Sequence, residues 1–249
     1  MKMMKMFLGF SCSLLLSALL ACSTTGANTS TNIPQNNSDD AAIERCRKLL
    51  DTNPDDASAR EELNRLVARP KAISDEQDRR IREILRQYAR PGKASLVSKG
   101  EPGEPLAVSG MVKSSAGQPV AGAVLYLFHT DAQGHYARGT AISERNARLF
   151  AFIKTDREGR FEFSTIRPGG YPAPPGRDTE RDRIPQHIHI QVTAAGYQLR
   201  NLEIVFQDDA RMTPYWVDWA HTRNHPIVTL SRDKDGVQHG SCEIVLQAQ

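Results

Sequence analysis

The sequence predicts a mainly β protein, a β-sandwich over residues 104–249 that is preceded by a short helical extension over residues 40–92. The main observation is a series of short β-rich runs separated by turn residues, such as "LAVSGMVKS", "GAVLYLFHT", "HIHIQV" and "VQHGSCEIVL". Two further turn signals, "DREG" at 156–159 and "DKDG" at 233–236, lie between β-rich runs and predict hairpins. Many short strands at this spacing are typical of two packed sheets.

A helical period replaces the β pattern before residue 92. Apolar side chains recur at helical spacing in three segments, which "NPDD" and Pro70 separate. Ser74, with Gln77 three residues later, forms a capping-box signature at the start of the third segment. Each apolar stripe is narrow, so we expect the three helices to pack either on the sandwich or on a second copy of the chain.

The first 22 residues, "MKMMKMFLGFSCSLLLSALLAC", read as a secretory signal peptide over 1–21. The end of this segment resembles the lipobox of bacterial lipoproteins, in which the cysteine after the cleavage site, here Cys22, is lipid-modified. Plain secretion after Ala21 is the alternative. Residues 22–39 are polar and predict a flexible tether. We therefore expect an exported protein anchored to the cell envelope, at the outer membrane if Ser23 acts as in Gram-negative sorting.

Charge and cysteine content narrow the function classes. The net charge of +3, which falls to +1 when the signal peptide with its two lysines is removed, gives no basic footprint for nucleic acid. Cys46 and Cys242 both lie on apolar faces of their segments. In an oxidising compartment, a disulfide between them and two buried thiols are both compatible with the sequence.

Two histidines stand one residue apart in "RIPQHIHI" at 183–190. On a strand His187 and His189 share one face, while Ile188 and Ile190 point to the other face. Two imidazoles on one face can converge on a metal ion. Taken alone, the pattern more often marks surface or hydrogen-bonded histidines.

Two tyrosines make the metal hypothesis stronger. Tyr136 follows "GQPVAGAVLYLFHTDAQGH", and Tyr171 follows "TDREGRFEFSTIRPGG". Together with "IPQHIHI" and "LEIVFQDD", these segments resemble the intradiol ring-cleavage dioxygenases, which include the catechol and protocatechuate 3,4-dioxygenases. The resemblance covers residues 108–209 and implies the β-sandwich fold of that family with a non-haem Fe(III) ion. Family members often carry helical dimer contacts where residues 40–90 lie, so the resemblance also implies a homodimer.

The resemblance implies a complete ligand set. Tyr171 and His187 would be axial ligands, Tyr136 and His189 equatorial ligands, and a solvent hydroxide would complete the shell. Phenolate is a hard anionic oxygen ligand that suits Fe(III), and a bound cation lets tyrosines, which ordinarily titrate near ~10, bind in ionised form. A catechol would chelate the iron while Tyr171 and the hydroxide remove its protons. Attack by O2 would then give a cis,cis-muconate-type dicarboxylate.

Two positions depart from the family pattern. Ile184 stands where the enzymes carry an arginine that faces the bound ring, and the nearest cations are Arg183 and Arg181. We take Arg183 as the candidate catalytic arginine. Glu203 stands where the enzymes carry a glutamine, and an unpaired carboxylate beside a dianionic substrate is unfavourable.

Three hypotheses follow from these residues. The first is an exported Fe(III) intradiol dioxygenase acting with O2 on a small aromatic diol, which places it in the catabolism of aromatic compounds. The second is a non-catalytic prealbumin-like binding module, because "GQPVAGAV" also resembles those sandwiches. The third is an iron-binding homologue with another substrate or without turnover.

We expect "RDTERDR" at 177–183 to be a solvated loop or a wall of the cleft, and "YWVDWA" at 215–220 to pack in the core or line that cleft.

Overall fold

A computed structural model describes residues 37–69, 73–137, 147–171 and 174–249. Cys22, the signal peptide and the tether up to residue 36 lie outside the described residues, so their predicted roles remain expectations. Residues 37–39, predicted as the end of the tether, belong instead to a helix that begins at Asn37. None of the helices in the described ranges is long and apolar enough to cross a membrane.

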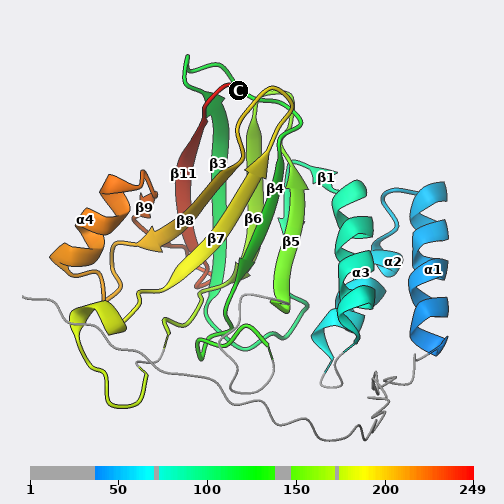
Figure 1. The fold of residues 1–249 in the computed structure, drawn as a ribbon, viewed down its shortest axis with the longest axis horizontal. Helices are drawn as coiled ribbons and strands as arrows, with labels where there is room; N and C mark the ends of the chain where they lie inside the picture. The colour runs from blue at the N-terminus through cyan, green and yellow to red at the C-terminus, as the bar shows by residue number, and fades with distance from the viewer. Residues whose placement is uncertain (1–36, 70–72, 138–146, 172–173) are drawn as a thin grey trace, which may run out of the picture. The chain divides into compact units, whose positions relative to one another are not determined.

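Two β-sheets form the body of the described chain, which confirms the predicted sandwich (Figure 1). The first has the strand order β1-β5-β4-β7-β8-β9, and the second has the order β10-β11-β3-β6-β2. The strands of the first sheet are β1 (Arg90–Pro91), β4 (Val124–His129), β5 (Leu149–Lys154), β7 (His187–Thr193), β8 (Arg200–Phe206) and β9 (Ile227–Val228). Those of the second are β2 (Lys93–Ser95), β3 (Pro105–Ser114), β6 (Arg160–Ile166), β10 (Ser231–Arg232) and β11 (Gln238–Leu246).

The alternation of side chains along the strands determines which face each sheet buries. Ile188, Ile190 and Val192 of β7 belong to the core between the sheets, with Val108 of β3 and Ile244 of β11. Each of these side chains is at most 2% exposed. The residues between them on β7 therefore face the outer side of the first sheet, where His187 and His189 lie.

Three helices form a second buried cluster on this outer side. The helices are α1 (Asn37–Thr52), α2 (Ala57–Ala68) and α3 (Asp75–Gln87), and their apolar residues pack with Phe128 and Phe150 of the sheet. The apolar stripes of the helices therefore pack on the chain's own sandwich, which is the first of the two alternatives that the sequence left open. The predicted capping box is present, since Gln77 N–H donates to Ser74 Oγ and Ser74 N–H donates to Gln77 Oε1.

Arg82 of α3 joins the helices to the sheet. Its guanidinium donates to the Tyr126 hydroxyl and to the Ala147 carbonyl, both at 2.8 Å, and lies 4.1 Å from the centre of the Phe150 ring. Asp78 accepts from the same guanidinium at 2.7 Å. The charge is therefore paired where the side chain is largely buried, as a buried guanidinium requires.

The segment after α3 contributes a strand to each sheet, which the sequence pattern did not predict. Arg90–Pro91 pairs with β5, and Lys93–Ser95 pairs with β6. Strands of two and three residues are too short for an alternating pattern, and proline is tolerated at the sheet edge where β1 lies.

Candidate metal centre

Four side chains converge at the start of β7. Tyr136 Oη contacts both Tyr171 Oη and His189 Nε2, the latter at 2.7 Å. His187 Nε2 lies 3.2 Å from Tyr171 Oη and 3.1 Å from His189 Nε2. The four donor atoms therefore form a closed ring, made of the four residues predicted as metal ligands.

The face of β7 that carries the histidines is covered by aromatic rings. Phe128 of β4 pairs with His189 across the strands, and their rings stack at 4.6 Å with an angle of 11°. Tyr136 is fully buried and His187 is 4% exposed. Phe128 was not predicted as a site residue, although the alternation along "LYLFHT" places it on the outer face of β4.

The two tyrosine loops are held together through their backbones. Gly169 N–H donates to the Asp131 carbonyl at 2.8 Å, and Thr130 Oγ1 donates to the Gly169 carbonyl at 2.8 Å. An ideal Cβ on Gly169 would lie 2.4 Å from Gly134 N and 2.7 Å from the Ala132 carbonyl oxygen. Only glycine allows this approach, which brings Tyr136 and Tyr171 within reach of each other.

Hydrogen bonding determines the tautomer of His187. Its Nδ1 lies 2.7 Å from the Pro185 carbonyl, which can only accept, so Nδ1 carries the proton. Nε2 then presents a lone pair toward the other three groups, as metal-binding imidazoles do. Burial also lowers the pKa of His187, and it lowers the pKa of His189 to about 3. Both rings are therefore neutral at neutral pH.

Glu203 lies on the far side of His189 from the cluster. β8 places it directly opposite His189, with its Oε1 3.7 Å from His189 Nδ1. A carboxylate in this place faces Nδ1 and leaves Nε2 to the other three donors. The expected conflict between Glu203 and an anionic ligand is therefore reduced by its orientation.

The donor set fits a single metal ion. Two ligand atoms that each lie ~2.1 Å from one ion, at a right angle, are ~3.0 Å apart. Three of the four separations between neighbouring donors, 2.7 to 3.2 Å, agree with this value, and the hydroxyls of Tyr136 and Tyr171 lie closer together. The 3.2 Å between Tyr171 Oη and His187 Nε2 is shorter than the ~4.2 Å between two opposite ligands, so the structure does not reproduce the predicted axial pairing of these two residues. Within the described part of the chain, no group of three or more His, Cys, Asp or Glu side chains could hold a metal. The two tyrosine oxygens therefore distinguish this centre from metal sites built of His, Cys, Asp and Glu alone. Phenolate oxygens are hard anionic ligands, and they favour a hard, highly charged ion.

The hydrogen bonds of Arg183, the predicted catalytic arginine, go to Asp178 and not to the four donor residues. Its guanidinium donates twice to Asp178 at 2.8 Å, and the side chain is 57% exposed. The loop that contains both residues packs on helix α4 (Pro214–Thr222) through a turn of 3₁₀ helix, Glu180–Asp182. There Trp216 Nε1 donates to the Glu180 carbonyl at 3.0 Å, so the aromatic segment "YWVDWA" packs against the charged loop.

The two cysteines are free thiols in separate places. Cys46 lies in the helical cluster, and Cys242 packs against the core between the sheets. The structure therefore selects two thiols over a disulfide.

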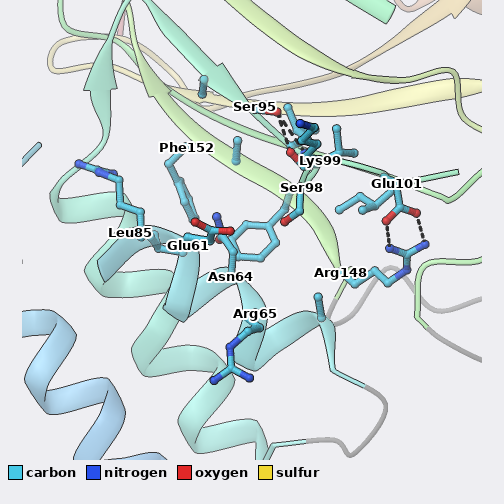
Figure 2. Close-up of a pocket in the computed structure, with 18 of the residues that line it drawn as sticks. Glu61, Asn64, Arg65, Leu85, Ser95, Ser98, Lys99, Glu101, Arg148 and Phe152 are labelled. Atoms are coloured by element: carbon cyan, nitrogen blue, oxygen red, sulfur yellow. Dashed lines mark hydrogen bonds and ion pairs between the residues drawn. The ribbon is translucent and has the colours of Figure 1, made fainter. Parts of the chain in front are cut away.

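A separate cavity of about 750 Å³ lies between α2 and the strands β2 and β5 (Figure 2). It is lined by Arg60, Asn64, Lys99 and Phe152 among others, but by none of the four donors. Arg148 and Glu101 form a twofold ion pair at 2.9 and 2.6 Å in its wall (Figure 2). The backbone of Arg148 also supports the metal centre, because its amide N–H donates to the backbone carbonyl of Tyr136 at 2.8 Å.

Comparison with known proteins agrees with the site. The sequence model of a family described as Dioxygenase matches residues 88–248. Catechol 1,2-dioxygenase 2 of Acinetobacter lwoffii is 30% identical over 153 residues, which are 58% of this chain and 54% of that protein. The 6-chlorohydroxyquinol 1,2-dioxygenase of Cupriavidus pinatubonensis is 35% identical over 116 residues, 41% of this chain and 40% of that protein.

The solved structures include proteins that share the fold. The catechol 1,2-dioxygenase of Pseudomonas arvilla C-1 superposes with a TM-score of 0.51 at 28% identity, over 64% of this chain and 57% of that chain. The chain spans about half the length of the curated relatives it matches. Since the family model covers well over half of the chain, and the four donors lie together, the chain belongs to the intradiol dioxygenase family.

Proposed function

We propose that this protein is an Fe(III)-dependent intradiol dioxygenase, which cleaves a catecholic aromatic ring with O2 to a cis,cis-muconate-type dicarboxylate. The observation that carries the proposal is the closed ring of donor atoms from Tyr136, Tyr171, His187 and His189, in which three of the four neighbouring separations are 2.7 to 3.2 Å. When bound there, Fe(III) would supply a Lewis acid that makes the two hydroxyls of a diol more acidic.

The chain's own residues divide the work. The two Nε2 atoms and the Tyr136 oxygen are fixed donors, because Tyr136 is fully buried and the His187 tautomer is held by the Pro185 carbonyl. Tyr171 is only partly buried, so its hydroxyl oxygen is the donor that can meet an incoming diol. We assign to this oxygen the role of accepting a proton from the substrate.

The stacked Phe128 and the helical cluster shape the environment of the donors. Aromatic and aliphatic side chains exclude water from one side of the site, where electrostatic interactions are consequently stronger. This surrounding favours a flat aromatic substrate over a charged polar one.

The test is to load the protein with Fe(III) and record its visible spectrum. Tyrosinate-to-Fe(III) charge transfer should give a red-brown colour, and a colourless protein with bound iron would refute the assignment. Oxygen uptake with catechol, protocatechuate and hydroxyquinol then measures turnover. Because Ile184 and Glu203 depart from the family pattern, coloured protein without uptake would favour the third hypothesis, an iron-binding homologue with another substrate or no turnover.

We also propose that the protein works outside the cytoplasm, anchored through Cys22 and acting as a homodimer. The signal-like segment and the lipobox-like ending support the location. Replacing Cys22 by alanine should move the protein from the membrane fraction to the soluble fraction. An unchanged membrane fraction would contradict the lipid anchor, and sedimentation of the solubilised protein measures the oligomeric state.

A further inference from the structure

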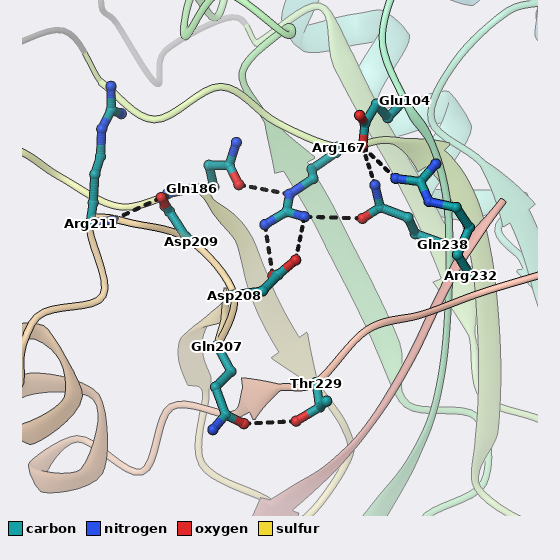
Figure 3. A network of polar contacts seen from close by, with 10 residues as sticks. All are labelled: Glu104, Arg167, Gln186, Gln207, Asp208, Asp209, Arg211, Thr229, Arg232 and Gln238. Carbon is teal, nitrogen blue, oxygen red and sulfur yellow. Dashed lines mark hydrogen bonds and ion pairs between the residues drawn. The ribbon is translucent and has the colours of Figure 1, made fainter. Parts of the chain in front are cut away.

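The turn after β8 holds the segment that leads into the histidine strand. Asp209 Oδ2 accepts from Gln186 N–H at 2.6 Å, and Arg211 Nη1 donates to the Ile184 carbonyl at 3.3 Å. Within the turn, Asp209 Oδ1 accepts from Arg211 N–H at 3.0 Å. Figure 3 shows Asp209 directed at Gln186 and the Arg211 side chain extending away from it. The backbone on both sides of Pro185 is therefore bound by one turn.

Pro185 is the residue whose position matters for His187. Its carbonyl is the acceptor for His187 Nδ1–H at 2.7 Å, and this bond places the lone pair on Nε2. Proline has no N–H of its own, so the neighbours Ile184 and Gln186 must supply the bonds that fix this carbonyl. Those are the two residues that Arg211 and Asp209 bind.

The same guanidinium lies against the loop of Tyr171. An ideal Cβ on Gly170 would lie 1.7 Å from Arg211 Nη1 and 2.8 Å from the Ile184 carbonyl oxygen. Glycine at position 170 is thus what allows Arg211 to pass between the two segments. Arg211 consequently contacts both the residue before Tyr171 and the segment before His187.

The neighbouring Arg167 network reaches the same segment in a different way. Arg167 Nε donates to the side-chain oxygen of Gln186 at 2.7 Å, and its two Nη atoms donate to Asp208 at 2.8 Å (Figure 3). These contacts hold a side chain and not the backbone of 184–186. The backbone restraint belongs to Asp209 and Arg211.

We propose that Asp209 and Arg211 are positioning residues of the metal centre. They hold the Pro185 carbonyl so that His187 stays in the tautomer with Nε2 free to bind the metal, and they keep the Tyr171 loop in place beside it. The link to catalysis rests on the proposed function, while the effect on the His187 tautomer does not. Supporting residues of this kind typically change metal affinity by ~10–100-fold.

The decisive experiment uses metal-free, 15N-histidine-labelled protein. Long-range 1H–15N spectra report the tautomer of His187, whose signals are identified by their loss in His187→Gln. We expect the Nδ1–H tautomer in the unmodified protein and a mixture of tautomers in Arg211→Met and in Asp209→Asn. Arg211→Lys should restore part of the Nδ1–H population, because lysine can still donate to the Ile184 carbonyl.

Arg232→Met is the matched control. Arg232 also donates to a backbone carbonyl, that of Gly236 at 2.8 Å, but it lies on β10 in the other sheet. This variant should keep the tautomer of the unmodified protein. A pure Nδ1–H tautomer in both Arg211→Met and Asp209→Asn would overturn the proposal. If one of these two variants fails to fold, the other decides, because a pure Nδ1–H tautomer there would also contradict the proposal.

Iron binding gives the second readout. With Fe(III), Arg211→Met should show a weaker charge-transfer band and a dissociation constant raised ~10–100-fold, while Arg232→Met should match the unmodified protein. An iron affinity and band in Arg211→Met equal to those of Arg232→Met would contradict the proposal. If the unmodified protein itself forms no coloured ferric complex, the proposed function is refuted. The positioning role is then tested only by the tautomer of His187 in the metal-free variants.

Discussion

Replacing Gly169 by alanine tests whether the backbone contact between the two tyrosine loops determines the spacing of the donors. The ideal Cβ would lie 2.4 Å from Gly134 N, 2.7 Å from the Ala132 oxygen and 2.9 Å from the Ala132 carbonyl carbon. Ordinary contacts begin at 3.4 Å, so one loop must move by about 1 Å relative to the other. All three neighbours are backbone atoms, and a change of side-chain rotamer cannot relieve the clash.

The expected cost can be stated in two measurements. Overpacking of this kind destabilises a protein by ~1–3 kcal/mol, which lowers the Tm of a chain of this size by about 2–12 °C. The same displacement separates the hydroxyls of Tyr136 and Tyr171, which are in hydrogen-bond contact. We therefore expect the dissociation constant for Fe(III) to rise ~10–100-fold and the charge-transfer band to weaken.

Gly110→Ala provides the control. Its ideal Cβ would lie 2.3 Å from Phe161 Cζ and 2.7 Å from the Cys242 carbonyl oxygen, so the overlap is similar, but β3 lies in the sheet without the donors. This variant should lose thermal stability and keep its iron affinity. The reasoning is refuted if Gly169→Ala binds iron as the unmodified protein does, or if Gly110→Ala loses iron to the same extent.

Three further predictions concern single residues and pH. Tyr171→Phe removes one oxygen donor and the proposed proton acceptor, so the ferric band should weaken and oxygen uptake should slow; an unchanged spectrum would mean that Tyr171 is not a ligand. Burial lowers the pKa of His129 to about 4 and that of His189 to about 3, while both rings in the unfolded chain titrate near ~6.5. Between the folded and unfolded pKa values the unfolded chain binds more protons than the folded protein. The free energy of unfolding of the metal-free protein should therefore decrease as the pH falls below ~6.5, by about 1.4 kcal/mol per pH unit for each histidine. Equal midpoints of urea denaturation at pH 7 and pH 5 would contradict this. Glu101→Ala leaves the Arg148 guanidinium, which is 10% exposed, without the carboxylate that binds it twice. The variant should be destabilised by ~3 kcal/mol in thermal denaturation. A melting temperature within 1–2 °C of that of the unmodified protein would mean that Asp131 alone is a sufficient partner for Arg148.

Much of the fold followed from local patterns. The alternation in "HIHIQV" placed Ile188 and Ile190 in the core and both histidines on the opposite face, as the structure has them. The Ser74 capping box began a helix where it was expected. Such features depend on residues close in the sequence, which is why the order of the residues suffices. By contrast, β1 and β2 are too short to carry a pattern, and they became visible only through their pairing with β5 and β6.

The candidate site divides in the same way. The sequence by itself determined the four donor types and, through family resemblance, their positions in the chain. Only the tertiary structure decided that Glu203 faces the outer nitrogen of His189, that Arg183 pairs with Asp178, and that Cys46 and Cys242 stay apart. It also brought Arg211 between Gly170 and Ile184, residues that are 41 and 27 positions away. Close approaches of this kind depend on how separate loops pack, and no local sequence pattern records them.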